Sequence, residues 1–206
     1  FDALGAVVRE CARESGLDIQ LVGDNPEVFN VIARFGLIRG CRTHVAFVVD
    51  DGMARGVVDD EAIGYWGQKI VLAAQDMGLN TCWCALCSRK KSRAVVAPGK
   101  KIRLVIAVGH GKTQGFSRKT KSVEALSSVE CAKAPAWFAA AMEAAQLAPT
   151  AMNNQNFKIT LLSDGKTVRI DAPQSGLNVI DEGIVRCNFE IAANEAGADW
   201  RWERDI

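Results

Sequence analysis

The sequence predicts an α+β protein, and three observations lead to this fold class. Segments with helical spacing of apolar residues alternate with shorter runs rich in β-branched residues, and glycine or proline marks most of the boundaries. Hydrophobic residues make up 49% of the chain and charged residues 24%, proportions typical of globular proteins and not of disordered ones. The length of 206 residues is enough for one large domain or for two closely packed halves.

Helices and strands alternate in the first part of the chain. Ala3–Ser15 has apolar residues at helical spacing, and Gly16 follows where helices commonly end. The longest predicted helix, Asp59–Gly78, has acidic residues in its first turn and ends at glycine, as the helix dipole and C-terminal capping favour. Further helices are predicted at Pro26–Ala33 and Ser88–Val96, and strands at Asp18–Val22, Val45–Val49, Thr81–Cys84 and Lys101–Val108. The second and fourth strands are nearly all apolar, so we expect them to be buried.

The composition changes beyond the last of these strands. Gly109, Gly111 and Gly115 punctuate a loop that runs into basic residues, which predicts a mobile or ligand-shaping connection. The elements predicted after it are a helix opened by Pro135 and reaching Leu147, strands Phe157–Leu162 and Thr167–Asp171 around an Asp164-Gly165 turn, and a last helix Asp181–Ala196.

Charge and apolar pattern argue against several classes of function. Twenty-five basic and 24 acidic residues leave a net charge of +1, so no overall field would attract nucleic acid or an anionic membrane. The longest apolar stretches, such as Leu104–Val108, are too short to span a bilayer, and no secretory leader opens the chain, so we expect a cytoplasmic protein. Seven cysteines, an odd number spread singly, are expected to be reduced thiols.

Four consecutive amide side chains, at residues 153–156, stand between a helix end fixed by Pro149 and a strand start at Phe157. Amides carry both hydrogen-bond donors and acceptors, the mixture that the pyrimidine edge of a flavin needs. A metal or a phosphate would instead favour charged side chains. The alternative interpretation is a capping and turn segment, because asparagine and threonine are common there.

Three stretches in this chain resemble the FMN-dependent nitroreductase family. Ala148–Phe157 reads Ala-Pro-Thr-x-x-Asn-x-Gln-x-Phe and is similar to the family signature Ala-Pro-Ser-x-x-Asn-x-Gln-Pro-Trp. Ile63–Trp83 resembles the central helix of the family and the glycine-leucine exit that follows it. Leu104–Gly109, followed by the basic residues 118–121, resembles the strand and tail that approach the flavin phosphate.

The late position of the amide signature resembles one branch of the family, often called putative nitroreductases. This resemblance implies a nitroreductase-like fold, with a mixed central sheet flanked by helices and two pseudo-equivalent halves, about 1–128 and 129–206. In ordinary members two identical chains build each flavin site, whereas here the late half would play the part of the partner. A monomer with two fused halves or a homodimer is therefore expected.

The resemblance also implies an activity and its residues. The expected enzyme transfers a hydride from NAD(P)H through FMN to a small acceptor such as a nitroaromatic or a quinone, by a ping-pong mechanism that needs no catalytic side chain. By matched position, Thr150, Asn153 and Gln155 would lie along the flavin ring and ribityl chain. The backbone at Cys84 and Ala85 would lie near the reactive edge of the ring, where its donors would stabilise negative charge.

By matched position in the family, Arg118, Lys119 and Lys121 would bind the FMN phosphate, since a dianionic phosphate needs cations close by. The alternative for this basic run is a solvated loop.

Two further hypotheses remain open. The arginine-rich Arg-Arg-Ser-x-Arg segment of the family has no counterpart before Phe1, and Asn156 and Phe157 replace its Pro-Trp. The chain could thus be a non-catalytic module with the fold but without flavin. Alternatively, Cys82, Cys84 and Cys87 could bind zinc or an iron-sulfur cluster, with Cys41 or Cys11 as a fourth ligand.

Overall fold

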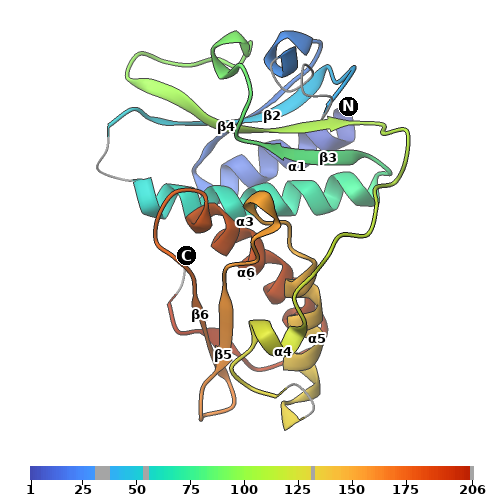
Figure 1. Ribbon diagram of the computed structural model, residues 1–206. Coiled ribbons are helices and arrows are strands. Elements are labelled where there is room, and N and C mark those ends of the chain that lie inside the picture. The colour runs from blue at the N-terminus through green and yellow to red at the C-terminus, as the bar shows by residue number, and fades with distance from the viewer. Residues whose placement is uncertain (31–37, 53–55, 131–132, 205–206) are drawn as a thin grey trace. The chain divides into compact units, whose positions relative to one another are not determined.

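The computed structural model describes residues 1–30, 38–52, 56–130 and 133–204 (Figure 1). The chain divides into two compact units. The first unit comprises Phe1–Arg55 and Lys69–Ser117, and the second comprises Gly56–Gln68 and Arg118–Ile206. Helix α3 (Gly56–Asp76) contributes its first part to the second unit and its last part to the first. None of the helices described is both long and apolar enough to cross a membrane.

The first unit is built on a four-stranded antiparallel sheet. The strands are β1 (Asp18–Val22), β2 (Thr43–Asp50), β3 (Asn80–Cys84) and β4 (Lys100–Gly109), in the order β1-β2-β4-β3. Its other described elements include α1 (Asp2–Ser15), the last part of α3 and the short 3₁₀ turns η1 (Pro26–Phe29) and η3 (Arg89–Lys91). Residues 44–48 of β2 and 104–108 of β4 are buried, which confirms that the two most apolar predicted strands form the centre of a core.

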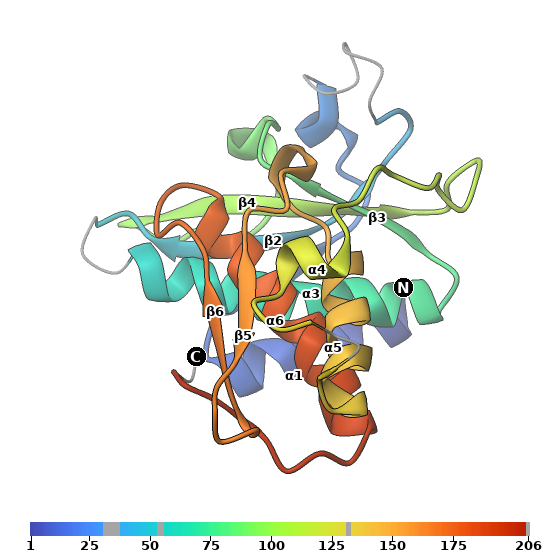
Figure 2. The same ribbon diagram turned by 60° about the horizontal axis from the view of Figure 1, so that its bottom comes forward.

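The second unit combines two long helices with a small sheet. Its elements are α4 (Val123–Leu126), α5 (Ala136–Leu147), the 3₁₀ turn η5 (Ala151–Asn153), β5 (Lys158–Leu161), β6 (Thr167–Asp171), α6 (Asn178–Glu195) and β7 (Arg201–Trp202). β5 pairs with β6 in antiparallel fashion and β6 with β7 in parallel. Helices α5 and α6 lie side by side in both views (Figure 1 and Figure 2), and Phe138 and Phe189 meet between them with ring centroids 5.7 Å apart.

Two glycines let the first part of α3 cross α6 closely inside the second unit. A Cβ atom on Gly64 would lie 2.0 Å from the carbonyl oxygen of Ile180, and one on Gly183 would lie 2.0 Å from that of Glu61. Any larger residue at either position would force the helices apart. The Gly64 and Gly183 positions therefore fix how these two helices pack.

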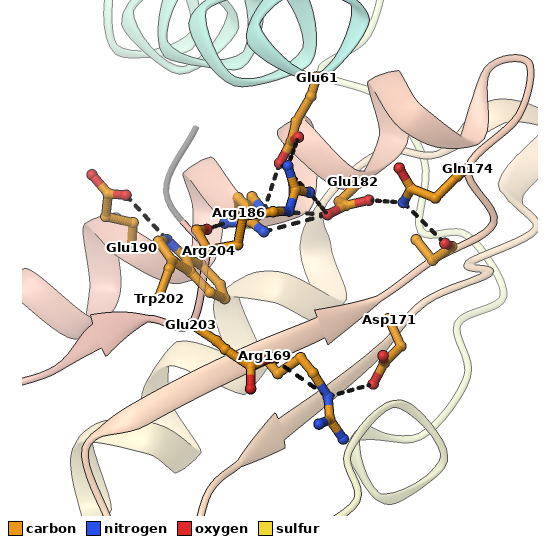
Figure 3. A network of polar contacts seen from close by, with 11 residues as sticks. Glu61, Arg169, Asp171, Gln174, Glu182, Arg186, Glu190, Trp202, Glu203 and Arg204 are labelled. Carbon is orange, nitrogen blue, oxygen red and sulfur yellow. Dashed lines mark hydrogen bonds and ion pairs between the residues drawn. The ribbon is translucent and has the colours of Figure 1, made fainter. Parts of the chain in front are cut away.

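Four charged side chains at this helix crossing form a network of ion pairs (Figure 3). Arg186 contacts Glu61 at 2.9 Å and Glu182 at 3.4 Å, and Arg204 contacts the same two carboxylates at 2.9 and 3.0 Å. The Arg186 guanidinium also lies 4.6 Å from the centre of the Trp202 ring. The network contains two positive and two negative side chains. Glu61, Glu182 and Arg186 are nearly buried, and each of them has a partner of opposite charge, without which a buried charge would be strongly destabilising.

The α+β class and most of the predicted elements are confirmed, including the end of α1 at Gly16, which has a φ of +70°. One predicted helix, Ser88–Val96, is wrong, because only the single 3₁₀ turn η3 forms there. After this turn, the backbone forms hydrogen bonds with side chains from elsewhere in the chain and not with itself as in a helix. Gln20 exchanges two hydrogen bonds of 2.8 Å with the backbone of Val95, and Asn25 binds the carbonyl of Lys91 and the N–H of Arg93.

Two other expectations differ from the structure. The predicted helix Pro26–Ala33 is a 3₁₀ turn over Pro26–Phe29, and its last residues lie outside the described ranges. The expected single mixed sheet is also wrong, since the described strands form two sheets, of which the first is wholly antiparallel. β6 and β7 pair in parallel, because the crossover helix α6 joins them.

Candidate functional site

The amide loop, residues 149–156, has an unusual backbone conformation. Three of its residues other than glycine have positive φ angles, with values of 53° at Met152, 55° at Asn153 and 45° at Gln155. Such conformations cost about 1–3 kcal/mol each, persist only where the surroundings enforce them, and cluster at ligand sites. Contacts with other parts of the chain must therefore hold the loop in this conformation.

Hydrogen bonds from three directions enforce this conformation. Within the loop, the N–H of Gln155 donates to the Thr150 hydroxyl at 3.0 Å. From α6, the Asp181 carboxylate accepts the N–H of Ala151 at 2.9 and 3.0 Å. From the segment 118–121, the Lys119 carbonyl accepts the Asn153 amide at 2.7 Å, and the N–H of Lys121 donates to the Gln155 side chain at 2.8 Å.

The structure thus brings together six of the residues singled out in the sequence, all in the second unit: Thr150, Asn153, Gln155, Arg118, Lys119 and Lys121. The side chains of Asn153, Asn154 and Asn156 are exposed, whereas Gln155 is only 2% exposed. Gln155 places its oxygen on the Lys121 N–H, and its nitrogen lies 3.4 Å from the Gln146 carbonyl. The exposed asparagine side chains lie at the surface, although the amide nitrogen of Asn153 already donates to the Lys119 carbonyl, and the buried Gln155 holds the loop beneath them.

Two of the three cations in the basic run bind backbone carbonyls. Arg118 donates to the carbonyls of Gln146 at 3.1 Å and Ala148 at 2.8 Å, at the C-terminal end of α5. Lys121 donates through its ammonium to the Gln155 carbonyl at 2.9 Å. Cations are favoured at a helix C-terminus, where carbonyls lack partners and the dipole is negative. Burial lowers the pKa of Arg118. The Lys119 side chain is exposed.

A cavity of about 340 Å³ lies beside the amide loop in the second unit. Its lining includes Lys121, Gln155, Asn156 and Lys158, with Asp171 as its acidic member. Two cations, one carboxylate, amide groups and Phe157 line this space, and this excess of positive charge suits a planar polar ring carrying negative charge. The residues of this unit therefore fit one edge of a flavin.

The other two predicted site residues, Cys84 and Ala85, lie in the first unit. Cys84 is buried at the end of β3, where its pairing with Val105 is the last of the β3–β4 ladder, so Ala85 follows beyond the ladder. Cys82, two residues earlier, is exposed.

The metal-binding hypothesis finds no support in the part of the chain that the structure describes. There, no three or more histidine, cysteine or acidic side chains are grouped as metal ligands. The thiols of Cys82, Cys84 and Cys87 instead donate to the backbone carbonyls of Trp83, Cys82 and Cys84, at 3.6, 3.2 and 3.7 Å.

Sequence reasoning missed Asp181 as a residue of the amide loop. Burial raises the pKa of this carboxyl to about 6, although the bond from the Ala151 N–H acts in the opposite direction. In the sequence, Asp181 is one of the acidic residues in the first turn of a helix, which are common there. Its partner is 30 residues away, and no local pattern signals such a contact.

Comparisons with known proteins identify the family and the fold. A family model described as "Putative TM nitroreductase" matches residues 1–193. The crystal structure of a "putative nitroreductase" from Thermotoga maritima is similar to this chain with a TM-score of 0.65 and 19% identity, covering 92% of this chain and 71% of that one. A search of the curated proteins finds no match.

Shorter similarities extend to other solved structures. A "putative nitroreductase in complex with FMN" from Desulfovibrio desulfuricans has 18% identity and a TM-score of 0.46, covering 61% of this chain and 82% of that one. A "Putative NADH dehydrogenase/NAD(P)H nitroreductase" from Parabacteroides distasonis has 17% identity and a TM-score of 0.44, covering 60% and 82%.

Proposed function

Because this chain belongs to the TM nitroreductase family, we propose that it is an FMN-dependent oxidoreductase that uses NAD(P)H to reduce a small acceptor such as a nitroaromatic or a quinone. The observation that carries the proposal is the strained amide loop, which displays its asparagines from a backbone held by Asp181 and the segment 118–121. A turn with no further role would not need three residues other than glycine at positive φ.

FMN, when bound, would supply the redox chemistry by accepting a hydride from NAD(P)H and passing electrons to the acceptor in a ping-pong cycle. The protein would supply binding and orientation. Asn153 and Thr150 would orient the ring from the amide loop. No side chain is required to move a proton.

The contacts of the second unit refine the proposed roles. Gln155, buried and bonded to the Lys121 N–H, is a positioning residue that keeps the loop in shape. Arg118 and Lys121 fix the same loop through carbonyls and would add positive potential beneath a phosphate. Lys119 is the member of the run whose exposed ammonium is best placed to contact a phosphate directly.

We also propose that the two halves of the chain correspond to the two subunits of ordinary family members. Among the α-helices and strands that the structure describes, the order helix, strand, strand, helix, strand occurs in α1-β1-β2-α3-β3 and again in α5-β5-β6-α6-β7. The strand pairs β1–β2 and β5–β6 are both antiparallel. A single chain would then take the part of both subunits, and the protein would act as a monomer on a small-molecule acceptor.

Flavin retention tests the proposed function. The purified protein is incubated with FMN and desalted, and the flavin absorbance bands are recorded together with NAD(P)H oxidation in the presence of a quinone. We expect a yellow protein that turns over. A colourless protein with no turnover would favour the non-catalytic module.

A matched pair of variants connects the flavin to the amide loop. Asn153→Ala should weaken FMN retention, because it removes the ring-facing amide and the bond to the Lys119 carbonyl. Gln75→Ala removes an exposed amide from α3 in the first unit and should retain FMN like the parent protein. Equal retention by all three proteins would contradict the proposed site.

A further inference from the structure

A second and larger cavity lies in the first unit, beside the start of β4. Its volume is about 760 Å³, within the range of small-molecule sites. Five of its lining residues are cations, namely Arg89, Lys90, Lys100, Lys101 and Arg103, and none of the residues that line it is acidic. In a chain with a net charge of +1, this is a strong local concentration of positive charge, and a cleft focuses such a field.

The β2–β4 ladder is irregular beside this basic cavity. In the β2–β4 ladder, Phe47 pairs with Leu104 and Val48 with Ile102, so Arg103 is an extra residue, a β-bulge. Bulges redirect side chains and are common beside active sites. The Arg89 guanidinium donates to the Arg103 carbonyl at 2.6 Å, which ties the η3 turn to the bulge.

The cations differ in how far they are already engaged. Lys101 forms an ion pair with Asp51 at 2.9 Å, outside the cavity lining. Lys90 and Lys100 are exposed at the cavity, at the end of η3 and the start of β4. These two ammonium groups are positioned to bind an anion, and replacing them removes no packing from the core.

The rest of the lining is apolar or uncharged. Ala94 and Val96 on the segment after η3, together with Ile102, provide an apolar wall beside the cations. A simple inorganic anion has no apolar surface to pack against such a wall, whereas the base of a nucleotide has. The lining therefore fits a ligand that combines several phosphates with a planar ring.

The basic cavity lies at the same end of the sheet as the backbone proposed for the reactive edge of the flavin. The β3–β4 ladder ends at Cys84 and Val105, and Lys100–Arg103 form the part of β4 beyond that end. The η3 turn begins at Arg89, five residues after Cys84. All these residues belong to the first unit.

Resting on the flavin function proposed above, we infer that the basic cavity binds the phosphates of the reductant and selects NADPH over NADH. NADPH differs from NADH by one phosphate on the adenosine ribose. A cluster of cations discriminates most strongly where a dianion is present in one ligand and absent from the other, since each charge-assisted bond adds to the difference.

Calorimetry on the flavin-free protein tests this inference without turnover. The probes are adenosine 2′,5′-bisphosphate, which carries the phosphate that distinguishes NADPH, and adenosine 5′-monophosphate, which lacks it. We expect the bisphosphate to bind about tenfold more tightly or better, as one charge-assisted contact would give. Equal affinities would overturn the inference.

Two double variants, each of which removes two positive charges, test whether the preference for the bisphosphate arises in the basic cavity. Lys90→Gln with Lys100→Gln should reduce the preference for the bisphosphate to nearly one. Arg9→Gln with Lys112→Gln removes two exposed cations of the first unit outside the cavity lining and should keep the preference. An unchanged preference in the first variant would also overturn the inference.

FMN retention, measured on the same preparations, separates the two proposals. A protein that retains FMN but shows no bisphosphate preference contradicts only the reductant site. A protein that shows the preference but loses FMN contradicts the flavin function. In the flavin-loaded enzyme, the ratio of kcat/KM for NADPH to that for NADH should fall in the cavity variant and stay constant in its control.

Discussion

The two basic clusters of this chain look alike in sequence and differ in structure. In the segment 118–121, Arg118 and Lys121 bind the carbonyls of Gln146, Ala148 and Gln155. Around the basic cavity, Lys90 and Lys100 instead stand exposed beside an apolar wall. Arg118 and Lys121 thus stabilise a loop, whereas Lys90 and Lys100 are proposed to offer their charge to a ligand. Counting cations along a sequence does not distinguish these roles, because the carbonyls that occupy a cation come from elsewhere in the chain.

The largest expected effect is on stability, at Arg118. Arg118→Ala removes two charge-assisted hydrogen bonds at the end of α5 and should lower the free energy of unfolding by about 2–3 kcal/mol. Lys90→Ala, at the basic cavity, should stay within about 0.5 kcal/mol of the parent protein. Urea denaturation at pH 7 measures both. If the two variants were equally stable, the contrast between the clusters would be lost.

Gln155→Ala should give the next largest effect, about 1–2 kcal/mol, because the Lys121 N–H loses its acceptor while the loop loses its buried clamp. Gln155→Glu keeps an acceptor oxygen toward that N–H and should recover part of the loss. A fully stable Gln155→Ala protein that has nonetheless lost FMN would instead identify Gln155 as a direct ligand.

The sequence predicted the elements better than it predicted their contacts. Gly16, Pro135 and the Asp164-Gly165 turn act through local backbone geometry, and the structure places helix ends and a hairpin at these positions. The segment Ser88–Val96 was predicted incorrectly because Gln20 and Asn25 bond its backbone from far along the chain. The charged network at Glu61 and Arg186 was missed for the same reason, since charged helical residues ordinarily face water.

The same limit applies to the candidate site. The amide cluster was visible as a run of residues, and its positive φ angles could not be inferred from asparagine and glutamine alone. Asp181 entered the site only through its bond to Ala151. The basic cavity was missed because its cations come from two segments, one of which was predicted to be a helix.

The pH dependence of stability should reveal Asp181. Its pKa is raised by burial from 3.8 to about 6, so the folded state holds a proton that the unfolded state releases between these values. Stability contributed by this group is present below pH 4 and is lost as the pH rises through 6. The Asp181→Asn variant has no carboxyl to titrate at this position. Its free energy of unfolding, relative to that of the parent protein, should therefore rise between pH 4 and 6 and stay constant above pH 6. A difference that does not vary with pH would show that the carboxyl is not buried as described.

The smallest effect on stability is expected at Lys119, the one residue of its cluster proposed to face a phosphate directly. Because its ammonium is exposed and the Asn153 amide binds its backbone carbonyl, Lys119→Gln should change the free energy of unfolding by less than about 0.5 kcal/mol. The same substitution should weaken FMN binding and leave riboflavin binding nearly unchanged, because riboflavin has no phosphate. Fluorescence titration with both flavins measures the difference. An equal loss for the two would assign Lys119 to the ring or the loop, and the second unit would then lack a direct phosphate contact in its basic run.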